Sequence, residues 1–226
     1  TSNDKAALIE LWGRETTPNP TVRPDKPNGL SAQVMDNNST RFKGTSQADW
    51  IIGNDGNNTI KAKGGNDYLQ GGLGNDRLNG NNGNDTLRGG NGDDIIHGGK
   101  GSDIIRGGGG EDVLYGNSGQ NTFSNTADGS IDIINIQCEQ QSSKKRRKKA
   151  MNKKQGTNTF DIIEELDAND QINLIGAKNR SISVQETIAL GETGVGIFAK
   201  GSLEALYIGD ELSSAQVLNM TTGLNK

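Results

Sequence analysis

A nine-residue unit is repeated nine times between Gly44 and Ser124, and this repeat constrains the fold more than any other feature of the chain. In frame, the units read GTSQADWII, GNDGNNTIK, AKGGNDYLQ, GGLGNDRLN, GNNGNDTLR, GGNGDDIIH, GGKGSDIIR, GGGGEDVLY and GNSGQNTFS. Glycine holds the first position in eight units, with Ala62 as the exception, and the fourth position in eight, with Gln47 as the exception. A short fixed period of this kind is typical of a solenoid, in which each unit adds one structural step.

The eighth position of the unit is apolar in every copy and therefore predicts the core. Its residues are Ile51, Ile60, Leu69, Leu78, Leu87, Ile96, Ile105, Leu114 and Phe123. The residues on either side are mixed, so one inward side chain lies between two outward ones, as in a short strand. The six residues before this strand are rich in glycine and asparagine and suit a turn. We expect an all-β fold, a right-handed parallel β-roll with about 18 residues in each coil.

The sixth position of the unit is acidic and predicts the chemistry. It holds Asp49, Asp67, Asp76, Asp85, Asp94, Asp103 and Asp112, with Asn58 and Asn121 as the two exceptions. Successive turns fall on opposite edges of a roll, so these carboxylates form two columns with neighbours ~5 Å apart, where they repel unless a cation lies between them. Ligands that are all oxygen indicate calcium, because zinc favours His or Cys and magnesium needs stricter octahedral geometry. The alternative is an array of solvated acidic turns without an ion.

The unit resembles the GGxGxD nonapeptide of the RTX, or haemolysin-type, calcium-binding family. The best matches are GGLGND at 71–76, GGNGDD at 89–94, GGKGSD at 98–103 and GGGGED at 107–112. The resemblance implies calcium between turns stacked on one edge, with about five well-formed sites. These sites would pair Asp49 with Asp67, Asp67 with Asp85, Asp85 with Asp103, Asp76 with Asp94, and Asp94 with Asp112. The turn glycines implied as part of the sites are Gly71, Gly74, Gly80, Gly83, Gly89, Gly92, Gly98, Gly101, Gly107 and Gly110.

The core of such a roll is thin, since each nine-residue unit contributes one regularly buried apolar side chain. Ordering a glycine-rich chain also costs more conformational entropy than ordering an average one. Calcium affinity then becomes folding free energy, so we expect the roll to be largely disordered without calcium. Sites that include Asn58 or Asn121 lose a charge and should be weak or empty.

The sequence pattern of the N-terminal 43 residues predicts a short helix followed by a linker. Ser2 to Trp12 groups its apolar residues on one side, and Gly13 would end the helix. This segment is either a frayed tail or a helix that docks on a neighbour through Trp12. All four prolines follow, at Pro18, Pro20, Pro24 and Pro27, which favours an extended linker.

The sequence pattern of residues 125–226 predicts a β-rich cap that covers the open end of the roll. We expect strands at Ser130–Ile136, Thr159–Ile163, Gln171–Ile175, Ser181–Val184, Gly194–Lys200 and Ala205–Ile208. A final helix would begin after the N-cap Ser213, run to Met220 and stop at Gly223. The family resemblance implies that a secretion signal lies in the last stretch.

A basic run interrupts the cap between two expected strands. It consists of Lys144, Lys145, Arg146, Arg147, Lys148 and Lys149, continued by Lys153 and Lys154. The run at 144–154 is either a solvated loop or a patch for an anionic polysaccharide or an acidic neighbouring roll. No aromatic residues are interleaved for stacking on bases, and with a net charge of −4 the chain as a whole is not expected to bind nucleic acid.

The remaining features exclude several classes of protein. Cys138 is the single cysteine, so an internal disulfide cannot form, and no 18-residue apolar run predicts a membrane span. His97 is the single histidine, and neither HExxH nor GxSxG occurs, so we expect no enzyme.

The combined prediction is a secreted, extracellular protein that folds on calcium. It would serve as a structural or surface-matrix component and could assemble with copies of itself. Secretion by the one-step type I route is implied by the family resemblance alone. Two alternatives remain: a C-terminal folding and secretion module of a larger RTX enzyme or toxin, or an adhesin that binds anionic glycans through the basic loop.

Overall fold

The structure is a computed structural model that describes residues 30, 32–124, 129–138, 160–164, 166, 168–176, 182–189, 192–199, 202–208 and 212–224. The expected helix at Ser2–Trp12, the proline-rich linker and the basic run at 144–154 lie outside the described residues. Ser31–Lys226 form one compact unit, which contains the repeats.

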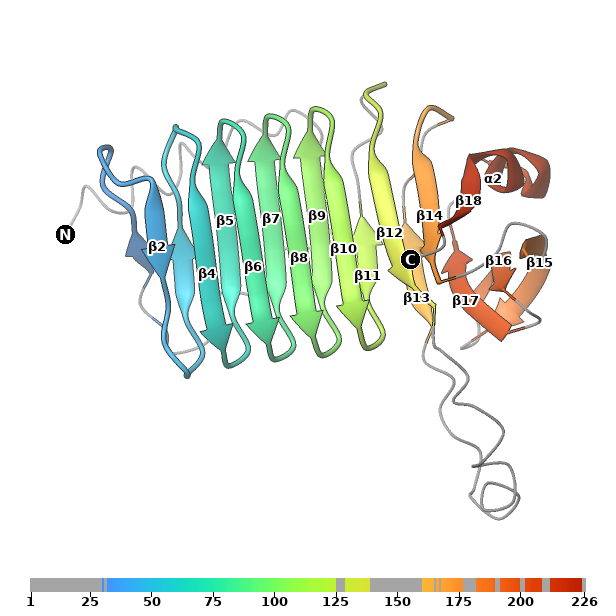
Figure 1. The fold of residues 1–226 in the computed structure, drawn as a ribbon, viewed down its shortest axis with the longest axis horizontal. Coiled ribbons are helices and arrows are strands. Elements are labelled where there is room, and N and C mark those ends of the chain that lie inside the picture. Colours follow the sequence, from blue (N-terminus) through green and yellow to red (C-terminus); the bar gives the residue numbers. More distant parts are fainter. Residues whose placement is uncertain are drawn as a thin grey trace, which may run out of the picture. The chain divides into compact units, whose positions relative to one another are not determined.

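Two parallel sheets are built from the repeats, and successive units alternate between them (Figure 1). One sheet contains β3 (Trp50–Ile52), β5 (Tyr68–Leu73), β7 (Thr86–Asn91), β9 (Ile104–Gly109) and β11 (Thr122–Ser124). The other contains β4 (Thr59–Gly64), β6 (Arg77–Asn82), β8 (Ile95–Lys100) and β10 (Val113–Ser118). Leu69 pairs with Leu87 and Leu78 with Ile96, a shift of one coil in each case. The predicted parallel roll with 18 residues per coil is confirmed.

Most strands of the repeats are longer than predicted. We expected three residues around the eighth position, but β5 to β10 each have six. Each strand continues through the first three positions of the next unit, so the first-position glycine is a second inward residue, two after the core residue. The reason is that glycine adds no side chain to the interior, and the backbone can stay extended there. The turn is correspondingly shorter than the six residues expected.

The fourth-position glycines make the tight turns possible. Gly83 has φ +133°, and a Cβ on it would touch the carbonyl oxygen of Gly65 in the coil before. Gly101 repeats this arrangement over Gly83, with φ +127°. An L side chain at these positions would both strain the backbone and separate the stacked turns.

The roll extends beyond 44–124 at both ends and has about 6 turns. Before the repeats, β1 (Gln33–Val34) pairs with β3 and β2 (Arg41–Lys43) pairs with β4, both in parallel. After the repeats, β12 (Ile133–Gln137) and β14 (Gln171–Ile175) continue one sheet, which ends with β18 (Thr221–Leu224). In the other sheet β13 (Asp161–Glu164) follows β11. The cap therefore begins as a continuation of the roll.

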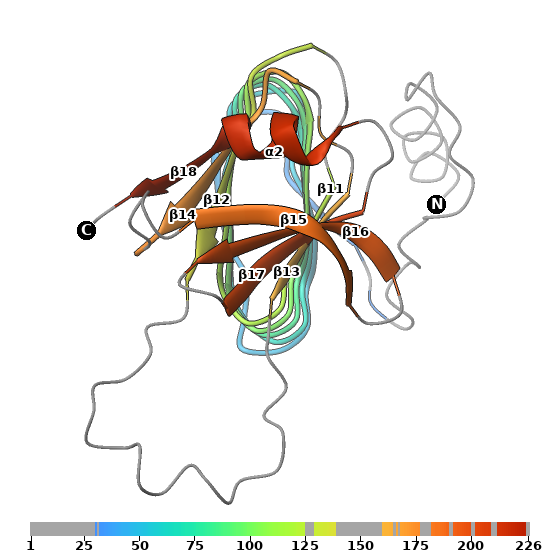
Figure 2. The same cartoon turned by 90° about the vertical axis from the view of Figure 1, so that its right-hand side faces the viewer.

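The end of the molecule is closed by antiparallel strands and a helix. β17 (Ser202–Tyr207) pairs in parallel with β13, whereas β16 (Glu192–Ala199) and β15 (Ile182–Ala189) add in antiparallel fashion. In Figure 2 these strands and α2 (Ser214–Met220) lie in front of the stacked coils. Ser213 caps α2 as predicted, with its side chain accepting from the backbone N–H of Gln216. Gly223 is not the stop, because α2 ends at Met220 and Gly223 lies within β18.

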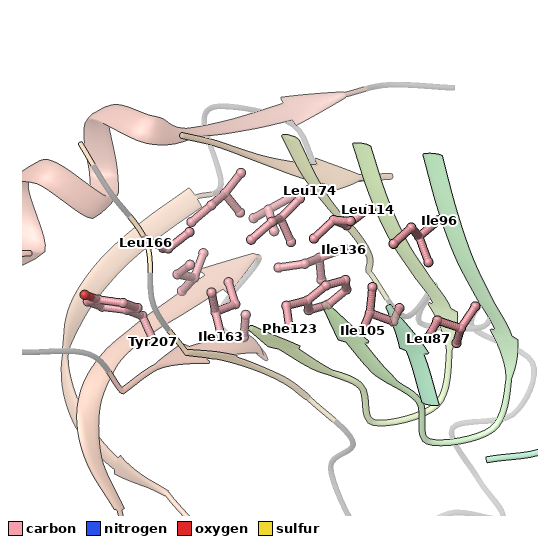
Figure 3. Close-up of a cluster of buried hydrophobic side chains, with 14 of the residues drawn as sticks. Leu87, Ile96, Ile105, Leu114, Phe123, Ile136, Ile163, Leu166, Leu174 and Tyr207 are labelled. Atoms are coloured by element: carbon pink, nitrogen blue, oxygen red, sulfur yellow. The ribbon is translucent and has the colours of Figure 1, made fainter. Parts of the chain in front are cut away.

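The core is a row of apolar side chains between the two sheets (Figure 3). All nine eighth-position residues belong to it and are at most 1% exposed. Beyond the repeats, Ile136 and Leu174 take inward positions that correspond to the first-position glycines. The interior therefore changes from half glycine in the roll to fully apolar in the cap.

Candidate calcium-binding turns

The sixth-position side chains line the two turn edges of the roll, and each is buried. In the aspartates that follow Asp49, Oδ1 accepts a hydrogen bond from the backbone N–H one coil earlier. Asp67 Oδ1 accepts from Asp49 at 2.7 Å, Asp85 Oδ1 from Asp67 at 2.8 Å, and Asp94 Oδ1 from Asp76 at 2.7 Å. The same bond joins Asp103 to Asp85 and Asp112 to Asp94. The two predicted columns of aspartates are therefore present, and each coil is tied to the next by a carboxylate.

The second carboxylate oxygen has no such donor in five of these residues. Oδ2 of Asp67, Asp76, Asp85, Asp94 and Asp103 is buried without a hydrogen-bond partner. Burying an unpaired carboxylate oxygen is costly. The arrangement is therefore stable only if the group is protonated or a cation lies beside it.

Burial raises the pKa of these carboxyls well above their usual value. Desolvation raises the pKa of Asp76 and Asp94 to about 7 and outweighs the backbone N–H donors that act in the opposite direction. The pKa of Asp67 rises to about 7 for the same reason, with the neighbouring Asp85 and Asp49 adding to the effect. The pKa of Asp85 and of Asp103 rises to about 6. Ionisation of these groups near neutral pH thus calls for a nearby positive charge.

The first-position glycines allow the backbone to pack directly against the buried Oδ2 atoms. A Cβ on Gly71 would touch Asp76 Oδ2 and would lie 2.6 Å from the carbonyl oxygen of Gly89 in the next coil. A Cβ on Gly80 would touch Asp85 Oδ2 and would lie 2.7 Å from the carbonyl oxygen of Gly98. In these turns a carboxylate oxygen and a backbone carbonyl oxygen therefore lie close together, and such oxygens suit a hard cation such as calcium.

The predicted glycines divide into two groups in the structure. Gly71, Gly80, Gly89 and Gly98 border the buried Oδ2 atoms, and the carbonyl oxygen of Gly107 faces Gly89. Gly74, Gly83, Gly92, Gly101 and Gly110 lie in the turns with positive φ, each against a turn of the preceding coil. Among the described residues no three Asp, Glu, His or Cys side chains converge, so backbone oxygens have to complete any ligand set.

The two asparagines lack the charge, and of the two only Asn121 keeps the hydrogen bond of the column. Asn121 Oδ1 accepts from the backbone N–H of Asp103 at 3.0 Å, just as an aspartate does. Asn58 Oδ1 accepts from Asn54 N at 2.8 Å. Weak or empty sites at these two positions stay a prediction.

Asp49 differs from the other aspartates. Its Oδ2 accepts from both N–H and O–H of Thr45, at 2.6 and 3.0 Å, and its Oδ1 accepts from Gln33 Nε2 at 3.0 Å. Because protein donors already satisfy this carboxylate, the pairing of Asp49 with Asp67 has the least structural support of the five predicted sites.

Three further aspartates extend the columns into the cap, and the sequence analysis missed them. Asp132 Oδ1 accepts from Asp112 N at 2.7 Å, Asp161 Oδ1 from Asn121 N at 2.8 Å, and Asp170 Oδ1 from Asp132 N at 3.0 Å. These bonds span 20, 40 and 38 residues, so the nine-residue frame is lost. The sequence signal that remains for these residues is local. It is an aspartate two residues before an inward isoleucine, as in DII at 132–134 and at 161–163.

A comparison with known families agrees with this geometry. Residues 37–69, 52–87, 62–96, 70–105 and 88–123 each match the family described as RTX calcium-binding nonapeptide repeat (4 copies). Residues 37–123 therefore carry calcium-binding repeats of this type, which supports a calcium-binding protein. No curated protein matches the chain. Within the part of the chain that the structure describes, no helix is both long and apolar enough to span a membrane.

Proposed function

We propose that the protein is a secreted, non-catalytic scaffold whose roll folds when calcium binds along the two aspartate columns. It would serve outside the cell as a structural component of a surface matrix. The observation that carries the proposal is the set of five buried Oδ2 atoms without a hydrogen-bond partner. A fold that buries such atoms in every coil depends on a ligand that neutralises them.

The residues that would hold calcium are Asp67, Asp76, Asp85, Asp94, Asp103 and Asp112, together with carbonyl oxygens of first-position glycines such as Gly89 and Gly98. Calcium supplies the positive charge that allows facing carboxylates to ionise inside the roll. Because each column joins successive coils, binding in one turn favours the order of the next one.

Coupling of folding to calcium suits a protein that works outside the cell. RTX repeats are typical of secreted bacterial proteins. Extracellular calcium modules bind with dissociation constants of about 10⁻⁴ to 10⁻³ M, so such a roll stays unfolded where calcium is scarce and folds where it is abundant.

A non-catalytic role is supported by the regularity of the carboxylates. An acid–base pair needs two carboxyls in different environments, with pKa values pushed apart. Here burial raises the pKa of Asp76 and Asp94 alike, to about 7. Equivalent groups at one-coil intervals suit repeated ligation rather than a reaction centre.

Circular dichroism and analytical ultracentrifugation test this function. Calcium added to chelated protein is expected to produce a cooperative gain of β-structure that magnesium at the same concentration does not produce. Larger particles at the same calcium midpoint, together with recovery of the protein from the medium or surface of the producing cells, would support the matrix role. A folded spectrum in chelator, or retention in the cytosol, would contradict the proposal.

A further inference from the structure

The outer face of the eight-stranded sheet is basic, although the chain has a net charge of −4. Six exposed cations lie on its first four strands: Arg41, Lys43, Lys61, Lys63, Arg77 and Lys100. No strand of this sheet, from β2 to β18, contains an acidic residue. We call these six residues the basic sheet face.

Strand pairing brings the cations close together. Lys43 of β2 pairs directly with Lys61 of β4. Thr59 of β4 pairs with Arg41 on one side and with Arg77 of β6 on the other. Lys61 and Lys63, two positions apart on β4, are both exposed. Like charges opposite each other destabilise a sheet, and an anionic ligand would relieve the repulsion between these cations.

A polar depression lies beside the cations, with a volume of about 620 Å³. Lys63 and Lys100 border it, and Asn79, Asn81, Asn82 and Ser118 line it with amides and a hydroxyl. Gly99 lies in register between Asn81 and Asn117, and its missing side chain deepens the surface there. Such a lining offers both charge and many hydrogen-bonding groups to one ligand.

The aromatic residues of the face argue against binding to bases. The rings of His97 and Tyr115 stack with centroids 4.4 Å apart and planes within 5°. These residues pair on neighbouring strands, so the ring faces are turned toward each other and the ring edges point outward. A base needs an exposed ring face for stacking, whereas the hydroxyls of a sugar can bond to polar ring edges.

We infer that the basic sheet face and its depression bind an acidic polysaccharide, one that carries carboxylates among its hydroxyls. This site is separate in sequence from the basic run at 144–154. The inference rests on the proposed function in one respect, since the face exists only when calcium has folded the roll.

The inference is tested on the full chain with calcium at saturation, with a short oligogalacturonate as probe and calorimetry as readout. The variant Lys63→Gln/Lys100→Gln removes two charges from the border of the depression. Its matched control, Arg88→Gln/Arg106→Gln, removes two charges from the opposite, ten-stranded sheet, where these arginines pair in register. A third variant replaces the cations of 144–154 by glutamine.

We expect the first variant to bind the probe about tenfold more weakly, whereas the control and the loop variant should stay within about twofold of the parent. Equal losses in the first two variants, loss only in the loop variant, or tighter binding of a single-stranded DNA oligomer than of the probe would overturn the inference. If circular dichroism shows a calcium-folded roll that does not bind the probe, the inference fails and the proposed function stands. If calcium does not fold the roll, the proposed function fails as well.

Discussion

At the scale of the residue, the two oxygens of each buried aspartate have separate tasks. In Asp85, Oδ1 accepts the backbone N–H of Asp67 at 2.8 Å, whereas Oδ2 is buried without a hydrogen-bond partner. The natural Asn121 shows that an amide can perform the first task, since its Oδ1 accepts from Asp103 N at 3.0 Å. Substitution of aspartate by asparagine therefore removes the charge and spares the hydrogen bond.

The pH dependence of the calcium-free protein follows from the raised pKa values. The pKa of Asp76 and Asp94 rises from 3.8 to about 7 on folding, so the folded roll keeps protons that the unfolded chain has released. The stabilisation that these two carboxyls give the folded state is fully present below pH 3.8, where they are protonated in both states. It is lost as the pH rises through about 7, where they ionise in the folded state. We expect calcium-free protein to gain β-structure, followed by circular dichroism, as the pH falls from about 8 to about 5, because protonation removes the buried charges. More β-structure at the alkaline pH would show that the carboxyls are not buried as described.

Calcium should reverse this trend, because protons and calcium compete for the same oxygens. In saturating calcium, the unfolding midpoint is expected to rise between about pH 5 and pH 8. The two titrations together separate the contribution of the buried carboxyls from general effects of pH on the chain.

The first-position glycines give a prediction with an internal control. Gly98→Ala would place a methyl group against Asp103, whose Cγ and Cβ lie 2.9 and 3.0 Å from the new Cβ. We expect a loss of about 1–3 kcal/mol in the free energy of unfolding in calcium, and weaker calcium binding. In Gly64→Ala the nearest atom is 3.7 Å away, so its effect should stay within about 1 kcal/mol. Equal urea midpoints for the two variants would contradict the close packing of Gly98 against the Asp103 carboxylate.

The aspartates show how far sequence reasoning reaches at this scale. Seven of the column residues follow from the nine-residue period, because one frame places them all at the sixth position. Asp132, Asp161 and Asp170 could not be found that way, since insertions of irregular length separate them from the repeats. The hydrogen bonds from Thr45 and Gln33 that distinguish Asp49 also depend on tertiary contacts beyond any repeat pattern.

At the scale of the element, the strands of the repeats differ from prediction in length and not in position, whereas β1, β2 and β18 were not predicted. The sequence pattern marks the inward residue at the eighth position, as at Leu78, but it gives no sign that the strand continues through Gly80 to Asn82. Glycine has low strand propensity, so its run was expected to form the turn. In a stacked roll the pairing of Asn81 with Gly99 overrides that propensity.

The helix α2 allows a test of the cap. The side chain of Ser213 accepts from Gln216 N, and Gln216 accepts from the backbone N–H of Ser213, a complete capping box. Ser213→Ala is expected to lower the stability of the C-terminal end by about 1 kcal/mol, whereas Ser214→Ala, one residue later, should have a smaller effect. Hydrogen exchange of the amides of Val217 and Met220 is a suitable measurement, because both side chains are buried in the core. Unchanged exchange in the Ser213 variant would show that the cap does not hold the helix.

At the scale of the whole molecule, the two ends of the roll are closed differently. At the N-terminal end of the described roll, β1 and β2 are only 2 and 3 residues long, and β2 carries Arg41 and Lys43, features that discourage pairing with another sheet. At the C-terminal end, β15, β16 and α2 cover the last coil. The existence of a cap was predictable from the loss of the period after Ser124. Its topology was not, because β17 pairs with β13 although 37 residues, 165–201, separate the two strands.

The central claim is that the buried aspartate columns bind calcium, and calorimetric calcium titration of two neighbouring variants tests it most directly. Asp94→Asn removes a buried charge, whereas Asp93→Asn removes an exposed one whose Oδ1 accepts from Glu111 N. The account predicts that Asp94→Asn loses bound calcium or binds it about tenfold or more weakly, while Asp93→Asn stays close to the parent. Equal calcium binding by the parent and both variants would contradict the account.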